Sequence, residues 1–230
     1  TILPKAMVIG GGVSGMNSAL ELATQGFETH LVERDNTLGG NARKLRITAK
    51  GEDIQAHLAE LTAKIEAQPL IKVHLGSTLK KVSGFVGNFK TTLASDKGEE
   101  VVEHGAAIIC TGASEYKPAE YLYGQHKAVM THQEIDAAFI SGELDPAKVG
   151  SAGFILCVGS REPERPYCSK VCCTHSIESA IYMKQANPNC QVTIIYRDMR
   201  TFGEREYLYR KAREAGVLFI RYNLDRKPVV

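Results

Sequence analysis

The sequence contains no tryptophan, has only 7% aromatic residues, and lacks an excess of charge of one sign, since 28 basic side chains are balanced by 26 acidic ones. A net charge of +2 provides no basic surface of the kind that binds nucleic acid, so we expect no nucleic-acid partner. Long apolar runs are also missing, because residues 106–110 and 153–158 fall far below the roughly 18 residues that span a bilayer. We expect no secretory signal, because Lys5 leads directly into the first apolar segment and the glycine turn. We therefore expect a cytoplasmic protein without direct membrane insertion.

What remains is the composition of an ordinary globular protein. The 230 residues, 43% of them hydrophobic, are enough for one or two domains with a sizeable core. The chain starts without an initiator methionine and ends just after an apolar stretch, which suggests a piece of a longer protein.

The hydrophobic pattern predicts an α/β fold. Short apolar segments alternate with amphipathic helical segments, as in parallel sheets, and residues 78–102 switch to the period of two that is typical of an antiparallel β-meander. The predicted strands cover residues 6–9, 28–33, 71–75, 105–110, 154–158, 191–196 and 217–222. The predicted helices cover residues 13–24, 52–66, 132–140, 169–185 and 204–215. We expect a Rossmann-like domain over residues 1–150, with the meander inserted in it, and a partial second Rossmann-like domain over residues 151–230.

A glycine-rich turn follows the first predicted strand. Gly10, Gly12 and Gly15 form the pattern G-x-G-x-x-G, and Glu33 ends the next strand. The first glycine permits the tight turn, the second lets backbone approach a diphosphate, the third lets helix and strand pack closely, and the acid can bind ribose hydroxyls. The helix N-terminus adds unpaired N–H groups and a partial positive charge. The pattern predicts a dinucleotide site, with a tight turn that binds no ligand as the alternative.

Two later segments resemble flavoproteins with two dinucleotide-binding domains, such as thioredoxin reductase. One is Arg34 with the Gly39-Gly40-Asn41 loop, and the other is Thr111-Gly112. The resemblance implies that the cofactor is FAD, with the Gly-Gly loop beside the diphosphate and flavin, the Thr-Gly turn closing near the cofactor, and the start of the meander contacting adenine. The residues expected to contact FAD are Gly10, Gly12, Val13, Ser14, Gly15, Glu33, Arg34, Gly39, Gly40, Asn41, Lys81, Val82, Thr111 and Gly112.

Four of the six cysteines lie close together in the sequence. Cys157, Cys168, Cys172 and Cys173 could supply the four thiolates that a [4Fe–4S] cluster usually takes. If the turn between them is already helical, Cys168 and Cys172 share one helical face. Three alternatives stay open: a structural zinc site, a redox disulfide such as Cys168–Cys172, and burial as small apolar side chains. Burial is the expectation for the two isolated cysteines.

The chain also resembles the A-subunit family of heterodisulfide reductase, which includes the A subunit of the quinone-interacting membrane-bound oxidoreductase. The resemblance rests on residues 82–89, 157–173 and 196–203. It implies an FAD oxidoreductase with a [4Fe–4S] cluster on the four clustered cysteines, which air can remove, working with other redox subunits of a complex. The family's additional ferredoxin-like cysteine motifs are missing here.

Two other functions stay open. A pyridine-nucleotide-dependent disulfide reductase would use Cys168 and Cys172, but the loop after residues 154–158 lacks the glycine-rich turn that binds NAD(P). A non-catalytic structural fragment is the other alternative. The sequence also leaves a homodimer open, and no residue stands out as a catalytic acid or base.

Overall fold

The computed structural model describes residues 2–223. The chain folds as two compact units, which we describe separately. Unit 1 comprises Thr1–Leu45 and Asp53–Ser114, and unit 2 comprises Arg46–Glu52 and Glu115–Val230. This division differs from the sequence-based boundary at residue 150, because a helix within residues 115–150 packs on unit 2.

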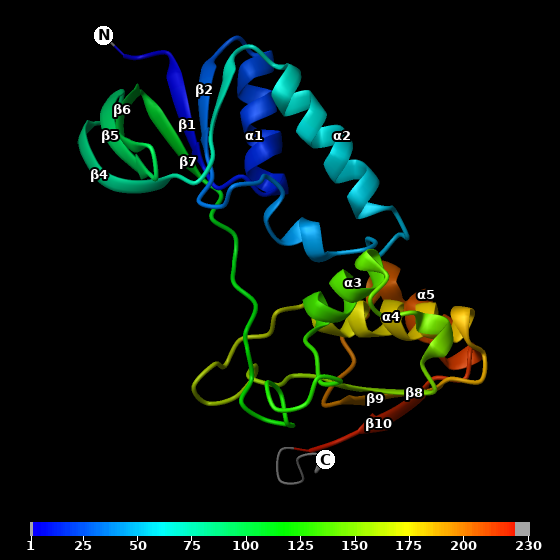
Figure 1. Ribbon diagram of the computed structural model, residues 1–230. Coiled ribbons are helices and arrows are strands. Elements are labelled where there is room, and N and C mark those ends of the chain that lie inside the picture. The colour runs from blue at the N-terminus through cyan, green and yellow to red at the C-terminus, as the bar shows by residue number, and fades with distance from the viewer. Residues whose placement is uncertain (1, 224–230) are drawn as a thin grey trace. The chain divides into compact units, whose positions relative to one another are not determined.

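Unit 1 is built on a four-stranded parallel sheet in the order β3-β2-β1-β7. Its strands are β1 (Lys5–Ile9), β2 (Glu28–Val32), β3 (Ile71–His74) and β7 (Ala106–Ile109). Helices α1 (Val13–Thr24) and α2 (Ile54–Ala67) lie together on one side of this sheet (Figure 1). Met16 of α1 and Leu61 of α2 belong to a buried apolar cluster with Val8 and Leu31 of the strands, as expected where amphipathic helices cover a sheet.

The period-two segment forms the predicted meander. Its strands are β4 (Thr78–Phe85), β5 (Asn88–Ser95) and β6 (Gly98–His104), paired antiparallel in chain order. Leu93 and Val102 of the meander form a small buried cluster with Met7 and Val32 of the parallel sheet. A short 3-10 helix, η1 (Gly40–Lys44), follows β2 along the chain.

Unit 2 has a three-stranded parallel sheet in the order β10-β9-β8. Its elements are α3 (His132–Ser141), η2 (Pro146–Lys148), β8 (Ser151–Ile155), α4 (Cys172–Ala186), β9 (Gln191–Tyr196), η3 (Gly203–Arg205), α5 (Glu206–Glu214) and β10 (Leu218–Arg221). Phe139 of α3, Ile177 of α4 and Leu208 of α5 share one buried core with Ile194 of β9. The α/β class with parallel sheets and an antiparallel insertion is therefore confirmed. No helix in residues 2–223 is long and apolar enough to cross a membrane.

The cysteine-bearing loop is longer than the sequence pattern predicts. Strand β8 ends at Ile155 rather than residue 158, and α4 begins at Cys172 rather than residue 169. Cys157 and Lys170 have φ angles of 65° and 62°, in the left-handed region that neither a strand nor a helix continues through. These two residues set the ends of the loop.

His132 at the start of α3 makes the stability of unit 2 depend on pH. Its ring stacks on Phe154, its centroid lies 5.0 Å from that of His175, and its Nε2 lies 2.6 Å from Ser176 Oγ. Burial, followed by repulsion from His175, lowers the pKa of His132 to about 3. In the unfolded chain this imidazole has a pKa near 6.5, so as the pH falls it is protonated in the unfolded state before it is protonated in the folded state. The free energy of unfolding therefore falls as the pH drops below about 6.5.

We expect a loss of at most about 1.4 kcal/mol per pH unit from this residue between about pH 6.5 and 5. His132→Gln keeps a polar side chain but removes the titration, so it should flatten this part of the profile. His57→Gln, at an exposed position of α2, is the matched control and should leave the slope unchanged. Urea denaturation at stepped pH measures the effect, and an equally steep slope in His132→Gln would contradict the assignment.

Candidate functional site

The glycine turn between β1 and α1 is closed tightly at two of its three glycines. A Cβ on Gly15 would lie 1.8 Å from the carbonyl oxygen of Gly10, and a Cβ on Gly10 would lie 2.2 Å from the carbonyl oxygen of Cys110. Gly10 also has a φ of 111°, which favours glycine. Strand, helix and the end of β7 can meet here only because both positions lack a side chain.

Gly12 serves a different purpose. It is the N-cap of α1 with a φ of –75°, and no side chain caps the helix. A Cβ built on Gly12 meets no atom within 4 Å. The missing side chain therefore leaves open space in front of the first-turn amides of α1. These amides belong to Val13, Ser14 and Gly15. Such a helix N-terminus favours an anion.

The Gly-Gly loop lies against this turn. The amide of Gly39 donates to the carbonyl of Gly11 at 2.8 Å, and Gly39 forms a parallel bridge with Gly12. Asn41 Nδ2 donates to the carbonyl of Ala113 at 2.9 Å, directly after Thr111-Gly112. Three segments that are far apart in the sequence therefore meet at one end of the parallel sheet, an arrangement that the resemblance to flavoproteins implies.

Glu33 is buried at the end of β2 and connects the same segments. Its carboxylate accepts from the amide of Gly11 at 2.7 Å and from the amide of Asp35 at 2.9 Å. A carboxylate has about four lone-pair sites, so these two bonds leave capacity for a ribose hydroxyl. Arg34 instead points to solvent, with its side chain 74% exposed.

The predicted adenine contacts are placed differently from the other site residues. Lys81 and Val82 lie in β4 opposite Thr92 and Thr91 of β5, and within the described residues they make no polar contact with the glycine turn. The segment between β3 and β4 does reach the site. The amide of Ser77 in this segment donates to the carbonyl of Glu33 at 2.9 Å. Sequence reasoning missed Ser77, because it follows a strand without any distinctive motif.

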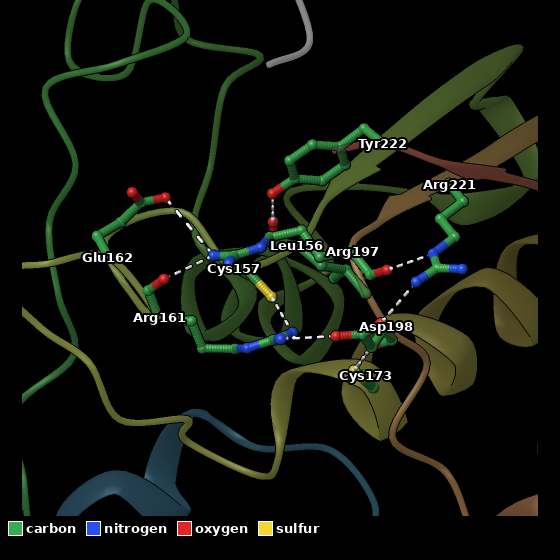
Figure 2. A network of polar contacts seen from close by, with 9 residues as sticks. All are labelled: Leu156, Cys157, Arg161, Glu162, Cys173, Arg197, Asp198, Arg221 and Tyr222. Carbon is green, nitrogen blue, oxygen red and sulfur yellow. Dashed lines mark hydrogen bonds and ion pairs between the residues drawn. The ribbon is translucent and has the colours of Figure 1, made fainter. Parts of the chain in front are cut away.

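The cysteine loop of unit 2 contains a second polar network (Figure 2). Arg161 bridges two groups: its Nη1 lies 4.0 Å from Cys157 Sγ, and its Nη2 donates to Asp198 Oδ2 at 2.6 Å. Asp198 Oδ1 also accepts from Arg221 at 3.1 Å, and the hydrogen bond from Arg161 lowers the pKa of Asp198. Cys173 Sγ lies 3.8 Å from the carbonyl oxygen of Asp198. Asp198 and Arg161 thus tie two cysteines to the end of β9.

Three of the four clustered cysteines influence one another electrostatically. A hydrogen bond from the Cys173 thiol lowers the pKa of Cys172 to about 6 and raises the pKa of Cys173. Burial, followed by the charge of Cys172, raises the pKa of Cys157. Near neutral pH, Cys172 at the first turn of α4 is therefore the thiolate of the group, as a helix N-terminus favours.

Cys168 stands apart from these three. Its Sγ accepts from the amide of Lys170 at 3.3 Å within its own loop. Because α4 begins only at Cys172, the turn from Cys168 is not helical, and the condition for a shared helical face of Cys168 and Cys172 is not met. All six cysteines are free thiols. Within residues 2–223, no three His, Cys, Asp or Glu side chains are arranged to hold a metal ion.

The loop after β8 also shows why a nucleotide is not expected there. A Cβ on Gly159 would lie 2.0 Å from the ring of Tyr116, so an aromatic side chain covers this glycine. The Arg165 guanidinium in turn lies 3.9 Å from the centre of the Tyr116 ring. Nothing in the sequence signals this contact, because Tyr116 lies in an irregular segment far from the loop.

Comparison with known proteins adds to this geometry. Residues 4–151 match the family model described as pyridine nucleotide-disulphide oxidoreductase. The chain is 28% identical to the second iron-sulfur A subunit of the CoB–CoM heterodisulfide reductase of Methanopyrus kandleri, covering 96% of this chain and 48% of that one. It is also 28% identical to the A subunit of the H(2):CoB-CoM heterodisulfide,ferredoxin reductase of Methanothermobacter marburgensis, covering 94% and 47%. The chain therefore spans about half the length of these relatives and is homologous to them.

The first of these alignments runs over 313 positions although the chain has 230 residues, so the relative carries internal stretches that this chain lacks. Among solved structures, thioredoxin reductase of Lactococcus lactis matches with a TM-score of 0.57 at 18% identity, over 94% of this chain and 64% of that one. The enzyme of T. acidophilum matches with a TM-score of 0.56 at 15% identity, over 94% and 63%. These likenesses confirm the thioredoxin-reductase-like fold.

Proposed function

Because the chain belongs to the pyridine nucleotide-disulphide oxidoreductase family of flavoproteins, we propose that it binds FAD on unit 1 and works as an electron-transfer subunit of a heterodisulfide-reductase-like complex. The observation that carries the proposal is the open cradle at Gly12, which faces an uncapped helix N-terminus while the glycines on either side are closed. A diphosphate supplies the negative charge and the acceptor oxygens that such a cradle lacks.

The arrangement fits each part of the cofactor. The amides around Gly12 would hold the diphosphate, Glu33 the adenosine ribose, and the loop at Gly40 the segment beside the flavin. Further contacts are expected from Gly10, Val13, Ser14, Gly15, Arg34, Gly39, Asn41, Thr111 and Gly112, and adenine contacts from Lys81 and Val82. FAD supplies one- and two-electron chemistry, while the protein contributes binding, orientation and burial.

The partners follow from the relatives. Both are named as subunits, one of a heterodisulfide reductase and one of a heterodisulfide,ferredoxin reductase. We propose other redox subunits as partners of this chain, and a cytoplasmic location. A homodimer stays a prediction from the sequence.

We also propose that Cys157, Cys168, Cys172 and Cys173 hold a [4Fe–4S] cluster that air can remove. Four thiols are the usual donor set, and three of them already affect one another's pKa. The described arrangement does not itself hold a metal ion, since within residues 2–223 no three of these side chains are positioned for one, and Cys168 Sγ accepts from the amide of Lys170. Cluster binding therefore requires the cysteine loop to rearrange so that all four thiols converge.

The cluster proposal predicts a specific loss of iron. After anaerobic reconstitution, the wild-type chain should contain about four iron atoms, whereas Cys168→Ser should lose most of them. Cys190→Ala removes an isolated buried cysteine and is the matched control that should retain the iron. Iron and acid-labile sulfide analysis provides the readout. Full iron content in Cys168→Ser would show that this residue is not a ligand.

A pyridine-nucleotide-dependent disulfide reductase using Cys168 and Cys172 is less well supported, because Tyr116 covers the only glycine that follows β8 within the loop. A non-catalytic fragment would not account for the open cradle at Gly12.

One experiment separates the three functions. In anaerobically purified full-length chain we expect one FAD per chain, reduced by a low-potential viologen but not by NADH or NADPH. Bleaching by NAD(P)H would favour the disulfide reductase, and a colourless protein that takes up no FAD would contradict the proposal.

A further inference from the structure

Unit 2 contains a cavity of about 230 Å³ that the functions above do not use. We call residues Arg46–Glu52 the strap. Residues of the strap, α4 and α5 line this cavity, which we call the strap cavity. The charged and aromatic residues that line it are Arg46, Lys50, Glu178, Tyr182, Tyr207 and Lys211. The Tyr207 hydroxyl donates to the carbonyl of Ala49 at 2.9 Å, which fixes the strap to α5.

Two buried polar atoms in the residues lining this cavity lack partners. Arg46 Nε and Glu178 Oε1 are both buried and have no hydrogen-bond partner within the described residues, and Glu178 as a whole is only 9% exposed. The Arg46 guanidinium is held 3.8 Å from the centre of the Tyr182 ring. Leaving a buried donor or acceptor unsatisfied costs about 1–3 kcal/mol each, so a bound group that offers the missing partners would be stabilised here.

The exposed charges around the cavity have one sign. Lys50 and Lys211 are exposed, and neither side-chain ammonium makes an ion pair or a hydrogen bond with any described residue. Glu178 is the only carboxylate among the lining residues. Burial raises the pKa of Glu178 to about 7, so near neutral pH a large fraction of this group is protonated and can act as a donor.

Size limits what can bind. The cavity is far larger than the roughly 10–15 Å³ that one water needs, but smaller than the roughly 300–1,000 Å³ of sites for drug-sized ligands. The cavity is therefore too small to enclose a nucleotide. A compact ion with several acceptor oxygens matches both the volume and the donors.

From these observations we infer that the strap cavity binds a small divalent oxyanion of the phosphate or sulfate class, held by Arg46, Lys50 and Lys211 and by the protonated carboxyl of Glu178. The inference goes beyond the proposed function, because every residue in it lies in unit 2 and none contributes to the FAD cradle. Sulfate carries no proton at neutral pH, so its binding requires Glu178 to take one up. Hydrogen phosphate can bring its own.

Burial is the main cause that favours this proton uptake by Glu178. Of the neighbouring charges, Asp136 on α3 also raises the pKa of Glu178, whereas His175 on its own helix, Arg46 on the strap and Arg205 on η3 lower it. Sulfate affinity should therefore fall as the pH rises above about 7, by up to about tenfold per pH unit. Hydrogen phosphate affinity should fall less steeply.

Isothermal titration calorimetry of the FAD-loaded full-length chain tests the inference, with sodium sulfate and sodium phosphate as probes and sodium chloride at equal ionic strength as the reference. We expect saturable binding of both oxyanions at one site. Lys50→Ala and Lys211→Ala should each weaken it by about three- to tenfold. Lys97→Ala, at an exposed turn of the meander, is the matched control and should not change it. Gly12→Ala, titrated without FAD, should keep oxyanion binding in the strap cavity, which separates this site from the FAD cradle.

Glu178→Gln separates oxyanion binding from proton uptake. The amide remains a neutral donor, so sulfate should still bind, but the proton uptake measured in two buffers of different ionisation enthalpy should disappear. Binding that is not saturable, an affinity that neither lysine substitution changes, or proton uptake that persists in Glu178→Gln would overturn the inference.

Discussion

Gly12→Ala is expected to weaken FAD binding by at least about 100-fold while leaving the fold intact. The added methyl group meets no protein atom within 4 Å and stands on a residue with a φ of –75°, so the protein without cofactor accommodates it without strain. It occupies the space in front of the first turn of α1, where the diphosphate must approach. Overpacking costs about 1–3 kcal/mol, and displaced hydrogen bonds to a charged group cost about 1.5–3 kcal/mol each.

Two matched substitutions make this prediction specific. Gly15→Ala places its Cβ 1.8 Å from the carbonyl oxygen of Gly10, so it should unfold unit 1 rather than merely block the cofactor. Gly153→Ala in β8, which also meets no atom within 4 Å, should affect neither stability nor FAD binding. Thermal denaturation of the FAD-free chain and titration with FAD separate these outcomes. Wild-type FAD affinity in Gly12→Ala would show that the cradle is not the diphosphate site.

Glu33→Ala is expected to destabilise unit 1 and weaken FAD binding together. The Glu33 carboxylate accepts from the buried amide of Gly11 and from the amide of Asp35, and removing it leaves these donors without an acceptor. At about 1–3 kcal/mol for each of the two unsatisfied groups, the free energy of unfolding should fall by about 2–6 kcal/mol. The hydrogen bond from the Gly11 amide to Glu33 also helps to hold the glycine turn. Losing this hydrogen bond should lower FAD affinity even apart from the ribose contact.

Glu33→Gln separates the two effects. The side-chain amide keeps one acceptor oxygen, so stability should fall less than in Glu33→Ala, while the lost charge still weakens the hydrogen bonds to the ribose. Glu66→Ala removes an exposed carboxylate at the end of α2 and is the control. Urea denaturation of the FAD-free chain measures the first effect. A loss of stability in Glu33→Ala no larger than in Glu66→Ala would contradict the structural role.

The parts of the fold marked by glycine or by strong periodicity could be predicted closely from the sequence. Helix α1 occupies residues 13–24 as predicted, because a glycine turn starts it and Gly26 follows its end. Strand β9 also matches its predicted range. The convergence of the Gly39-Gly40 loop on the glycine turn is expected only from the resemblance to flavoproteins with two dinucleotide-binding domains.

The cysteine loop could not be predicted in the same way. Its ends depend on left-handed backbone at Cys157 and Lys170, and neither residue type signals that conformation. The cover over Gly159 depends on Tyr116, which is distant in sequence. The strap likewise shows no motif, and its place in unit 2 depends on tertiary contacts from Arg46 to Asp136 and from Tyr207 to Ala49. Such contacts are set by packing rather than by local pattern.

The most direct test is a pair of fluorescence titrations of the flavin-free chain, one with FAD and one with riboflavin, which has the same ring system but no diphosphate or adenosine. If the helix N-terminus at Gly12 neutralises the diphosphate, FAD should bind one per chain and riboflavin at least about 100-fold more weakly. Equal affinity for the two flavins, or no change in flavin fluorescence when FAD is mixed with the chain, would contradict the account.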